Sequence, residues 1–530
     1  MNTPSPPRTQ IKAGLSVKEF WFSDYMIIGY IALLNLIMHL LAIKGFGYFR
    51  DEFYYIACSE HLAFGYVDQP PLSIFLLKAI RLILGDSLVA LRIFPVFGHT
   101  VFIFLTGVMA KKLGGGKFAL LLAAVAAFAP LGNYFMFTFY SMNFWDILIW
   151  QVCILLVLHI IKSDNTKYWL LFGIVAGIGL QNKISVLFLL FGIGAGVILT
   201  KKRICLKDKY FWIGFSIAGL LFLPYVLWNA MHDWATLEFM QNARAYKMTT
   251  VSPLEFFSGQ VLYNNPATLL IWLLGLWFFL FHEKGKEFRM FGWMFLAIYV
   301  VFTIQSAKDY YLAAAYPILF AGGAVLLELW LKKKLVIWIR PVLIFSLFFS
   351  TLLLCPLTLP IISVEDTIIH LQRIGISGTA GERHELGALP QHFADMHGWE
   401  EMVATVAQVY NKLTPEEQAI CGIYVRNYGE AGAIDFFGKK YGLPNATCPH
   451  NNYWLWGPTE FSGDVMIIFG FSRDVQRNLE DLQQYFESVE YGATFTCDYC
   501  MPYENNRPMF ICRNMKISPQ EIWDQEKNYN

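Results

Sequence analysis

The sequence YMIIGYIALLNLIMHLLAIKGFGYFRDEFYY, residues 25–55, joins a long apolar segment directly to two adjacent acids. Residues 25–45 are long enough to cross the roughly 30 Å hydrocarbon layer of a membrane as a helix. Asp51 and Glu52 follow at the membrane boundary, where an unpaired charge is costly. Two interpretations stay open: a polar cavity in which a carboxylate acts as a general base, or an exposed helix start, where the helix dipole favours acids.

The overall composition is that of an integral membrane protein. Of 530 residues, 56% are hydrophobic and only 15% are charged, whereas soluble domains carry about 25% charged residues. A net charge of +1 argues against nucleic acid as a partner. The apolar segments end near Pro356. We therefore expect a cytoplasmic N-terminal segment (1–24), a membrane domain (25–358) and a globular C-terminal domain (359–530).

Eleven apolar segments are candidate membrane spans. They are residues 25–45, 88–110, 118–137, 144–161, 168–182, 184–200, 211–230, 266–282, 290–306, 312–331 and 335–358. Basic residues cluster in five of the intervening loops, at 111–117, 162–167, 201–209, 284–289 and 332–334. With the N-terminus in the cytoplasm, all five loops fall on the cytoplasmic side, in agreement with the positive-inside rule.

This topology requires that residues 71–84 do not cross the membrane. The segment is short and carries Lys78 and Arg81, so it suits the interface better than the hydrocarbon core. We expect residues 46–87 to form one large outer loop with interfacial helices. The same count places the C-terminal domain outside the cytoplasm. Within that domain, the spacing of Cys497 and Cys500 favours a structural disulfide over half of a zinc site.

Further polar residues gather on the same predicted outer side. Asp68 and Gln69 precede two prolines, whose fixed φ angles hold them in a rigid turn near Asp51. Arg92 lies in the second span, where it either snorkels outward or binds an anion. The other candidates are Asn143, Asp146, Lys183, Lys308, Tyr310 and Tyr311. Cations of this kind can hold a lipid-linked phosphate, and aromatic rings can stack on a sugar.

These motifs together resemble the GT-C superfamily of polyprenyl-phosphate-sugar-dependent glycosyltransferases. The similar branch is glycosyltransferase family 39 with its bacterial relatives, which includes protein O-mannosyltransferases and lipid A aminoarabinose transferases. The motifs are RDE (50–52), VDQPPL (67–72), LRIFP (91–95), SMNFWD (141–146), NKIS (182–185) and KDYYL (308–312). In the C-terminal domain, NYGEAGA (427–433) and NNYWLWGP (451–458) look like a bacterial subgroup. The resemblance covers nearly the whole chain.

The resemblance implies a polytopic helical membrane protein of GT-C fold with a C-terminal extracytoplasmic α/β domain, in a bacterial cytoplasmic (inner) membrane. Its activity would be the inverting transfer of a hexose, pentose or aminosugar from a polyprenyl-phosphate carrier. The acceptor would be a hydroxyl of an envelope component: lipid A or lipopolysaccharide, another glycolipid, a polysaccharide or a protein. The donor, the acceptor and the lipid bilayer are then its partners, and no cofactor or metal is required.

Roles for single residues also follow from the resemblance. Asp51 would be the catalytic base, supported by Glu52. Asn143 or Asp146 would contact the sugar or acceptor. The candidates for the donor phosphate are Lys183, Arg92 and Lys308, with Tyr310 and Tyr311 beside them. Many relatives have His or Lys where this chain has Gln69, and a neutral amide cannot supply that charge.

The alternative is a membrane transporter or lipid flippase without transferase chemistry. Many spans and buried charges would suit such a protein. Transporters commonly show internal repeats and broken helices near the bilayer midplane, but no clear repeat is visible and the polar residues cluster at one rim. Walker A, GxGxxG and HExxH motifs are absent from the sequence, which removes an ATP-driven pump as an interpretation.

Overall fold

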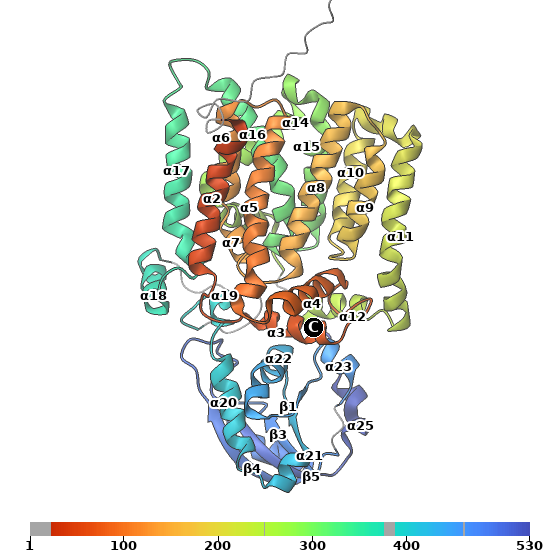
Figure 1. The fold of residues 1–530 in the computed structure, drawn as a ribbon, viewed down its shortest axis with the longest axis vertical. Coiled ribbons are helices and arrows are strands. Elements are labelled where there is room, and N and C mark those ends of the chain that lie inside the picture. The colour runs from red at the N-terminus through yellow and green to blue at the C-terminus, as the bar shows by residue number, and fades with distance from the viewer. Residues whose placement is uncertain (1–22, 248–249, 376–386, 459–461) are drawn as a thin grey trace, which may run out of the picture.

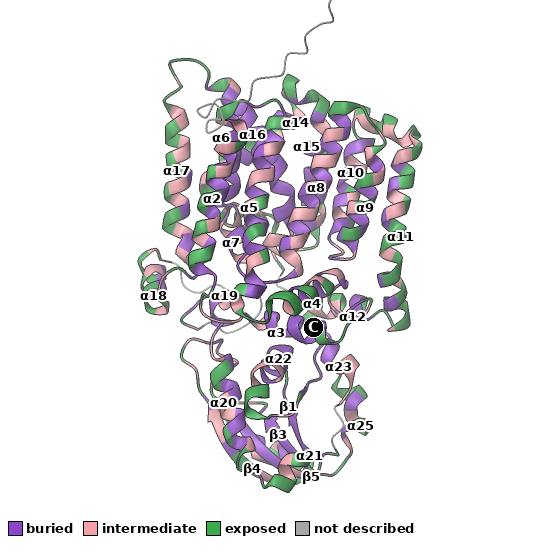
Figure 2. Cartoon of the chain, in the orientation of Figure 1, coloured by how far each residue is buried: buried purple, intermediate pink, exposed green. Residues whose placement is uncertain are grey.

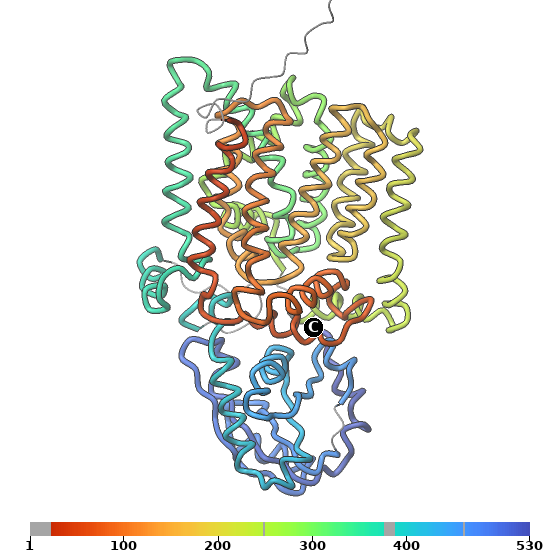
Figure 3. The backbone as a smooth tube through the Cα atoms, viewed as in Figure 1, coloured from red at the N-terminus to blue at the C-terminus, as the bar shows by residue number. Residues whose placement is uncertain are grey.

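The structure, a computed structural model, describes residues 23–247, 250–375, 387–458 and 462–530. A bundle of long helices is joined at one end to a smaller domain built on a sheet, with a layer of short helices between them (Figure 1). Most of the expected segment 1–24 lies outside the described residues. Short helices follow the last long helix and precede the sheet domain, and the C-terminus lies beside the short-helix layer (Figure 3).

A helix forms in each of the eleven predicted segments. These are α2 (Asp24–Ala42), α5 (Leu88–Lys112), α6 (Lys117–Phe128), α8 (Met142–Ser163), α9 (Tyr168–Leu180), α10 (Val186–Ile198), α11 (Lys209–Met231), α14 (Leu269–Leu280), α15 (Arg289–Ile304), α16 (Tyr316–Trp330) and α17 (Ile339–Leu354). Further, shorter helices lie between these eleven or follow the last of them. They are α3 (Arg50–Glu60), α4 (Leu72–Leu84), α7 (Leu131–Met136), α12 (Ala235–Asn242), α13 (Pro253–Tyr263), α18 (Val364–Arg373) and α19 (Gln391–Ala394).

Among the described residues, seven helices are long and apolar enough to cross a membrane. An eighth is added if α13 and α14, which meet at a bend of 97°, count as one span. The helices α6, α9 and α10 are apolar but have only 12 or 13 residues. The structure thus shows a polytopic helical membrane protein with seven or eight candidate spans, fewer than the eleven predicted.

Small residues let neighbouring helices approach closely, as expected where lipid removes the hydrophobic driving force between helices. A Cβ atom on Gly173 of α9 would lie 2.1 Å from the carbonyl oxygen of Gly214 on α11. A Cβ atom on Gly323 of α16 would lie 1.9 Å from the carbonyl oxygen of Ile271 on α14. Both helix pairs therefore depend on glycine at the crossing point.

The basic loops meet at the end of the bundle away from the sheet domain (Figure 1). Lys111, in the last turn of α5, pairs with Asp24 at the start of α2. Lys162, at the end of α8, donates a hydrogen bond of 2.6 Å to the carbonyl of Lys112. The loop after α10 and the loop between α14 and α15 line one cavity, to which Arg203 and Lys286 belong. These four loops share one end of the bundle, as the charge pattern predicts.

The C-terminal domain is a five-stranded mixed sheet of order β2-β1-β3-β5-β4. Its strands are β1 (Cys421–Tyr424), β2 (Ala446–Thr447), β3 (Val465–Phe469), β4 (Phe486–Phe495) and β5 (Arg507–Met515). β1 pairs in parallel with β2 and β3, whereas β5 is antiparallel to β3 and β4. Its helices are α20 (Trp399–Tyr410), α21 (Pro415–Ile420), α22 (Tyr428–Phe437), α23 (Asn452–Trp456), α24 (Val475–Gln483) and α25 (Pro519–Ile522). The predicted mixture of strands and helices is confirmed.

The sheet domain rests on the short helix α3 through α22. A Cβ atom on Gly429 would lie 2.3 Å from the Arg50 side chain, and one on Gly432 would lie 2.8 Å from Phe53. The two glycines therefore let the α22 backbone lie directly on α3. Most of α3 is buried between the bundle and the sheet domain (Figure 2).

A buried ion pair fixes the start of α3 to the bundle. Arg92 of α5 donates to both carboxylate oxygens of Glu52, from Nε at 3.1 Å and from Nη2 at 2.7 Å. Both side chains have no exposed surface. Glu52 also accepts from the backbone N–H of Tyr140, at 3.0 Å, just before α8. Such a pair is stable in a dry interior only when both charges keep their partners.

The surrounding backbone completes the enclosure of Arg92. Its guanidinium donates to the carbonyl of Gly47 at 2.7 Å and approaches that of Ile43 at 3.4 Å. Gly47 has a φ of +116°, which side-chain-bearing residues rarely adopt. The expected contact of Arg92 with a donor phosphate therefore does not agree with the structure, because protein oxygens surround the guanidinium. Snorkelling does not fit either, since the side chain points into the protein.

Breaking this pair should destabilise the protein strongly. The single variants Glu52→Gln and Arg92→Gln each leave a buried charge without its partner, at a cost of about 3–5 kcal/mol. We expect thermal unfolding of the purified protein in detergent to show a lowered midpoint for each. The double variant Glu52→Gln/Arg92→Gln should lose less stability than the sum of the two single losses. Additive losses in this cycle would contradict a direct buried interaction.

Candidate active site

The two adjacent acids of α3 point in different directions. Glu52 faces the bundle and caps the helix start, because it accepts from the Phe49 backbone N–H at 2.9 Å. Asp51 faces the C-terminal domain with 31% of its side chain exposed. Its Oδ1 accepts a hydrogen bond of 3.0 Å from the hydroxyl of Tyr428, the first residue of α22. Of the two, only Asp51 has solvent access, and Glu52 has the contacts of a structural carboxylate.

Arg50 lies beside Asp51 and is held by the C-terminal domain. Its Nη1 donates to the hydroxyl of Tyr503 at 2.5 Å, and its Nη2 approaches that of Tyr428 at 3.4 Å. Its Nε lies 3.8 Å from Asp51 Oδ1. Asp51 therefore sits next to a positive charge that the C-terminal domain holds in place.

Asp68 is held in the turn before the two prolines. The hydroxyl of Tyr54 donates to its Oδ1 at 2.9 Å. Asn452 of α23 also braces this turn, accepting from the Val67 N–H at 2.7 Å and from the Tyr54 hydroxyl at 3.2 Å. The side chain of Gln69 is fully buried and accepts from Ser73 at 3.3 Å. Gln69 thus stabilises the turn, which does not fit its expected contact with substrate.

A second cluster surrounds Lys183, in the turn between α9 and α10. Its Nζ donates to Asn143 Oδ1 at 2.7 Å and lies 3.9 Å from Asp146 Oδ2. The ammonium also lies over the rings of Tyr310 and Tyr311, 5.3 and 5.1 Å from their centroids. Three motifs far apart in the sequence therefore meet at one cation.

The remaining contacts orient this cluster. Asp146 accepts a hydrogen bond of 2.6 Å from Ser185, which fixes its carboxylate beside Lys183. Tyr310 and Tyr311 belong to the 3₁₀ helix η5 (Asp309–Ala315), which packs against α8. Lys308 is the residue that precedes η5. Lys183 keeps 13% of its side chain exposed, so a ligand can reach it.

The Asp51 and Lys183 clusters adjoin each other. Burial and then the negative charges of Asp51 and Asp68 raise the pKa of Tyr55 well above its usual range, and Tyr310 contributes to the same shift. The backbone N–H of Leu72, after the prolines, donates to the carbonyl of Gln181 at 2.8 Å. The structure therefore brings Asp51, Asp68 and the Lys183 cluster to the same end of the bundle.

Two residues of this site were not among those predicted from sequence, Tyr428 and Asn452. Both stand in the motifs that suggested a bacterial subgroup, at 427–433 and 451–458. The two motifs could have pointed to these residues, but nothing in the sequence shows that the C-terminal domain folds back onto α3.

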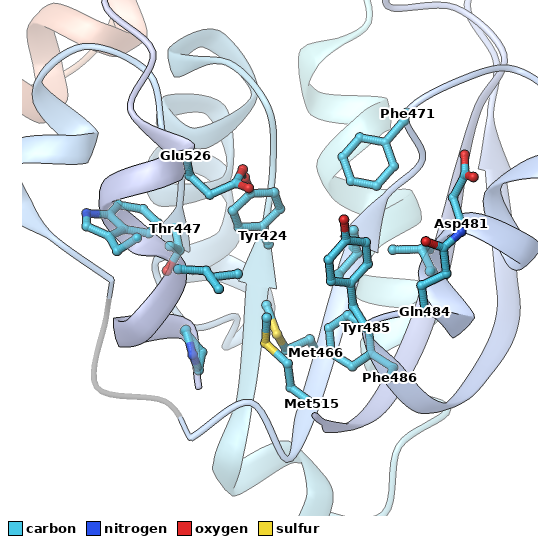
Figure 4. A pocket seen from close by; sticks show the side chains of 15 residues that line it. Tyr424, Thr447, Met466, Phe471, Asp481, Gln484, Tyr485, Phe486, Met515 and Glu526 are labelled. Carbon is cyan, nitrogen blue, oxygen red and sulfur yellow. The ribbon is translucent and has the colours of Figure 1, made fainter. Parts of the chain in front are cut away.

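A cavity of about 340 Å³ in the C-terminal domain is separate from this site (Figure 4). It lies on the sheet face formed by Met466 and Ile468, which packs with α24 rather than with α22. Its lining is mostly apolar, and the hydroxyl of Tyr424 donates to Glu526 across it at 2.7 Å. Because α22 and the opposite sheet face separate it from α3, this cavity does not contribute to the Asp51 cluster.

The cysteines of the described residues are all free thiols, so the structural disulfide expected in the C-terminal domain is not formed. The Cys500 N–H donates to the Cys497 sulfur at 3.2 Å. A hydrogen bond from the Cys500 thiol lowers the pKa of Cys497 to about 7. Within the described residues no group of three His, Cys, Asp or Glu side chains is arranged to hold a metal ion.

Comparison with known proteins agrees with this geometry. The family model of dolichyl-phosphate-mannose-protein mannosyltransferases matches residues 68–228. Lipid A galacturonosyltransferase RgtD of Rhizobium johnstonii is 22% identical over 291 residues, which span 54% of this chain and 60% of that protein.

Two crystal structures of ArnT from Cupriavidus metallidurans share the fold. The apo structure is 12% identical and covers 94% of this chain and 98% of its own, with a TM-score of 0.57. The complex with undecaprenyl phosphate is also 12% identical and covers 93% and 98%, with a TM-score of 0.54. Part of the chain, residues 68–228, is thus similar to the protein mannosyltransferase family, and the chain shares the fold of the ArnT structures.

Proposed function

We propose that this enzyme transfers a sugar from a polyprenyl phosphate to a hydroxyl group of an envelope glycolipid on the outer face of a bacterial cytoplasmic membrane, with inversion at the anomeric carbon. The observation that carries the proposal is the meeting of Asp51, a partly exposed carboxylate, with the Lys183 cluster at one end of the bundle. The names of two relatives support the two substrates: one ArnT structure contains undecaprenyl phosphate, and RgtD acts on lipid A.

The Lys183 cluster fits the donor phosphate. An ammonium on the bundle side of the site can reach a phosphate at the membrane surface and neutralise the charge that develops as it leaves. Asn143 and Asp146 fix the position of Lys183, and the rings of Tyr310 and Tyr311 offer faces for a sugar. Lys308 is a second cation for the phosphate, a role for which Arg92 is too enclosed.

Asp51 fits the role of general base. Tyr428 and Arg50 both approach its Oδ1, so Oδ2 is the oxygen that receives the acceptor proton. As that proton moves to Asp51, the acceptor oxygen forms a bond to the anomeric carbon, and the bond from this carbon to the phosphate oxygen breaks. The electron pair stays with the lipid phosphate, beside Lys183. Attack opposite the leaving phosphate inverts the anomeric centre, and no metal is needed for the charge balance.

The sidedness follows from the basic loops. They gather at the end of the bundle away from Asp51, which the positive-inside rule assigns to the cytoplasm. Residues 46–87 and 359–530 then lie outside the cytoplasm, the latter as a separate domain. In this proposal the short helices α6, α9 and α10 also cross, for eleven crossings. A transporter is the weaker interpretation despite the bend between α13 and α14, since the Asp51 and Lys183 clusters lie at an end of the bundle and not at its midplane.

Removing the proposed base should abolish transfer without unfolding the protein. Asp51→Asn keeps the shape and the Tyr428 contact but cannot take a proton, so kcat should fall by about 10²–10⁴-fold. The measurement is transfer from a polyprenyl-phosphate sugar by the purified enzyme in lipid nanodiscs. Asp86→Asn is the matched control, because Asp86 lies in the same outer loop and pairs with Arg81 on the surface. Full activity of a correctly inserted Asp51→Asn protein would rule out the base assignment.

Neutralising Lys183 should weaken both donor binding and departure of the phosphate. We expect Lys183→Met to lower kcat/KM for the donor by about 10²–10³-fold, the range seen when one charge-stabilising group is lost. Lys183→Arg should recover part of this loss, since it keeps the charge. Lys202→Met, in the basic loop at the other end of the bundle, is the control and should change little. Equal donor kinetics for Lys183→Met and the wild type would exclude a phosphate contact.

A further inference from the structure

A basic cavity of about 290 Å³ lies on the other side of Tyr428 from the bundle. Three arginines line it: Arg50 from α3, Arg426 from the loop between β1 and α22, and Arg507 from the start of β5. Tyr428 and His450 contribute further polar groups to the wall. Among the described residues that line it, none is an aspartate or a glutamate.

Arg426 and Arg507 are each fixed by a backbone carbonyl. Arg426 donates to the carbonyl of Phe471 at 3.2 Å and lies over its ring, 5.2 Å from the centroid. Arg507 donates to the carbonyl of Gly470 at 3.1 Å. Carboxylates lie nearby but do not line the cavity: Asp395 is 4.0 Å from Arg50, and the buried Glu504 interacts with Arg50 and Arg507. The charged side chains that line the cavity itself are the three arginines, whose N–H groups favour an anion.

The cavity is coupled directly to the proposed base. Tyr428 lines the cavity and donates its hydroxyl to Asp51. Arg50 lines the cavity and lies 3.8 Å from the same carboxylate. A group bound there is thus one side chain away from Asp51, and Lys183 is not among the residues that line the cavity. This position suits the acceptor and not the lipid phosphate of the donor.

We propose that the cavity binds an oxyanion, a phosphate or a carboxylate, on the head group of a glycolipid acceptor and thereby directs the acceptor hydroxyl to Asp51. Planar guanidinium groups bind such oxyanions through paired hydrogen bonds. The volume holds part of a head group, and the acyl chains stay in the bilayer. This inference rests on the proposed transferase function, because it assigns the acceptor of that reaction.

Arg426→Gln tests the acceptor contact in the full-length enzyme in nanodiscs. The probes are a glycolipid acceptor bearing a phosphate and the same glycolipid after removal of the phosphate. For the phosphorylated acceptor we expect KM to rise about tenfold, the effect of one lost charge-assisted hydrogen bond, with kcat nearly unchanged. The neutral acceptor should show no difference between variant and wild type. Arg426→Lys should recover part of the affinity.

Arg477→Gln is the matched control for this substitution. Arg477 is an exposed arginine of α24 outside the cavity, and it should leave KM for both acceptors unchanged. An unchanged KM of Arg426→Gln for the phosphorylated acceptor would overturn the proposal. A protein acceptor that is modified equally well by the wild type and by Arg426→Gln would overturn it too.

A binding measurement without turnover separates this site from the transferase proposal. Inorganic phosphate should raise the thermal midpoint of the wild type and of Asp51→Asn, but not that of Arg426→Gln/Arg507→Gln. Stabilisation by phosphate without any detectable transfer would reject the transferase proposal and keep the anion site. Transfer without such stabilisation would reject the anion site alone. If phosphate binds but does not compete with the acceptor, the cavity takes free phosphate and the acceptor assignment is overturned.

Discussion

A carboxylate and a guanidinium without access to water set the geometry of the whole outer end of this enzyme. Glu52 and Arg92 satisfy each other, and their remaining contacts reach the turn before α3 and Tyr140, two residues before α8 begins. The pair therefore fixes where α3 begins and, with it, where Asp51 points. The neighbouring acids therefore differ in role: the buried Glu52 holds the helix start, and the accessible Asp51 is the one to which we assign the proposed chemistry.

The site is shared between the two domains. The bundle supplies Lys183 with its oriented partners, and the short-helix layer supplies Asp51 and Asp68. The C-terminal domain adds Tyr428, which contacts Asp51, and Asn452, which holds the turn before the prolines. The ArnT structure with undecaprenyl phosphate shares the fold of this chain at 12% sequence identity.

Much of this arrangement could be predicted from sequence, because the lengths of apolar segments and the placement of lysines report directly on the membrane. The joint location of Asn143, Lys183 and Tyr310 followed from their shared side. Arg92 shows the limit: the sequence places a charge in a span but cannot say whether a ligand or a neighbouring carboxylate neutralises it. The sequence is equally limited for Gln69, because it cannot show that this amide bonds to Ser73 inside the protein. The contacts of Tyr428 and Asn452 depend on how the C-terminal domain docks onto α3, and such docking leaves no periodic pattern in the sequence.

The close packing of α22 on α3, made possible by Gly429 and Gly432, has a consequence for biogenesis. Asp51 is made early in translation, but its hydroxyl partner lies almost four hundred residues later, in a domain that must first form its own sheet. The membrane bundle can therefore insert completely while its carboxylate still lacks its final surroundings. A chain truncated before the C-terminal domain would keep its spans but lack the Tyr428 contact to Asp51. In the proposed function, the folding of the last third of the polypeptide therefore completes the active site.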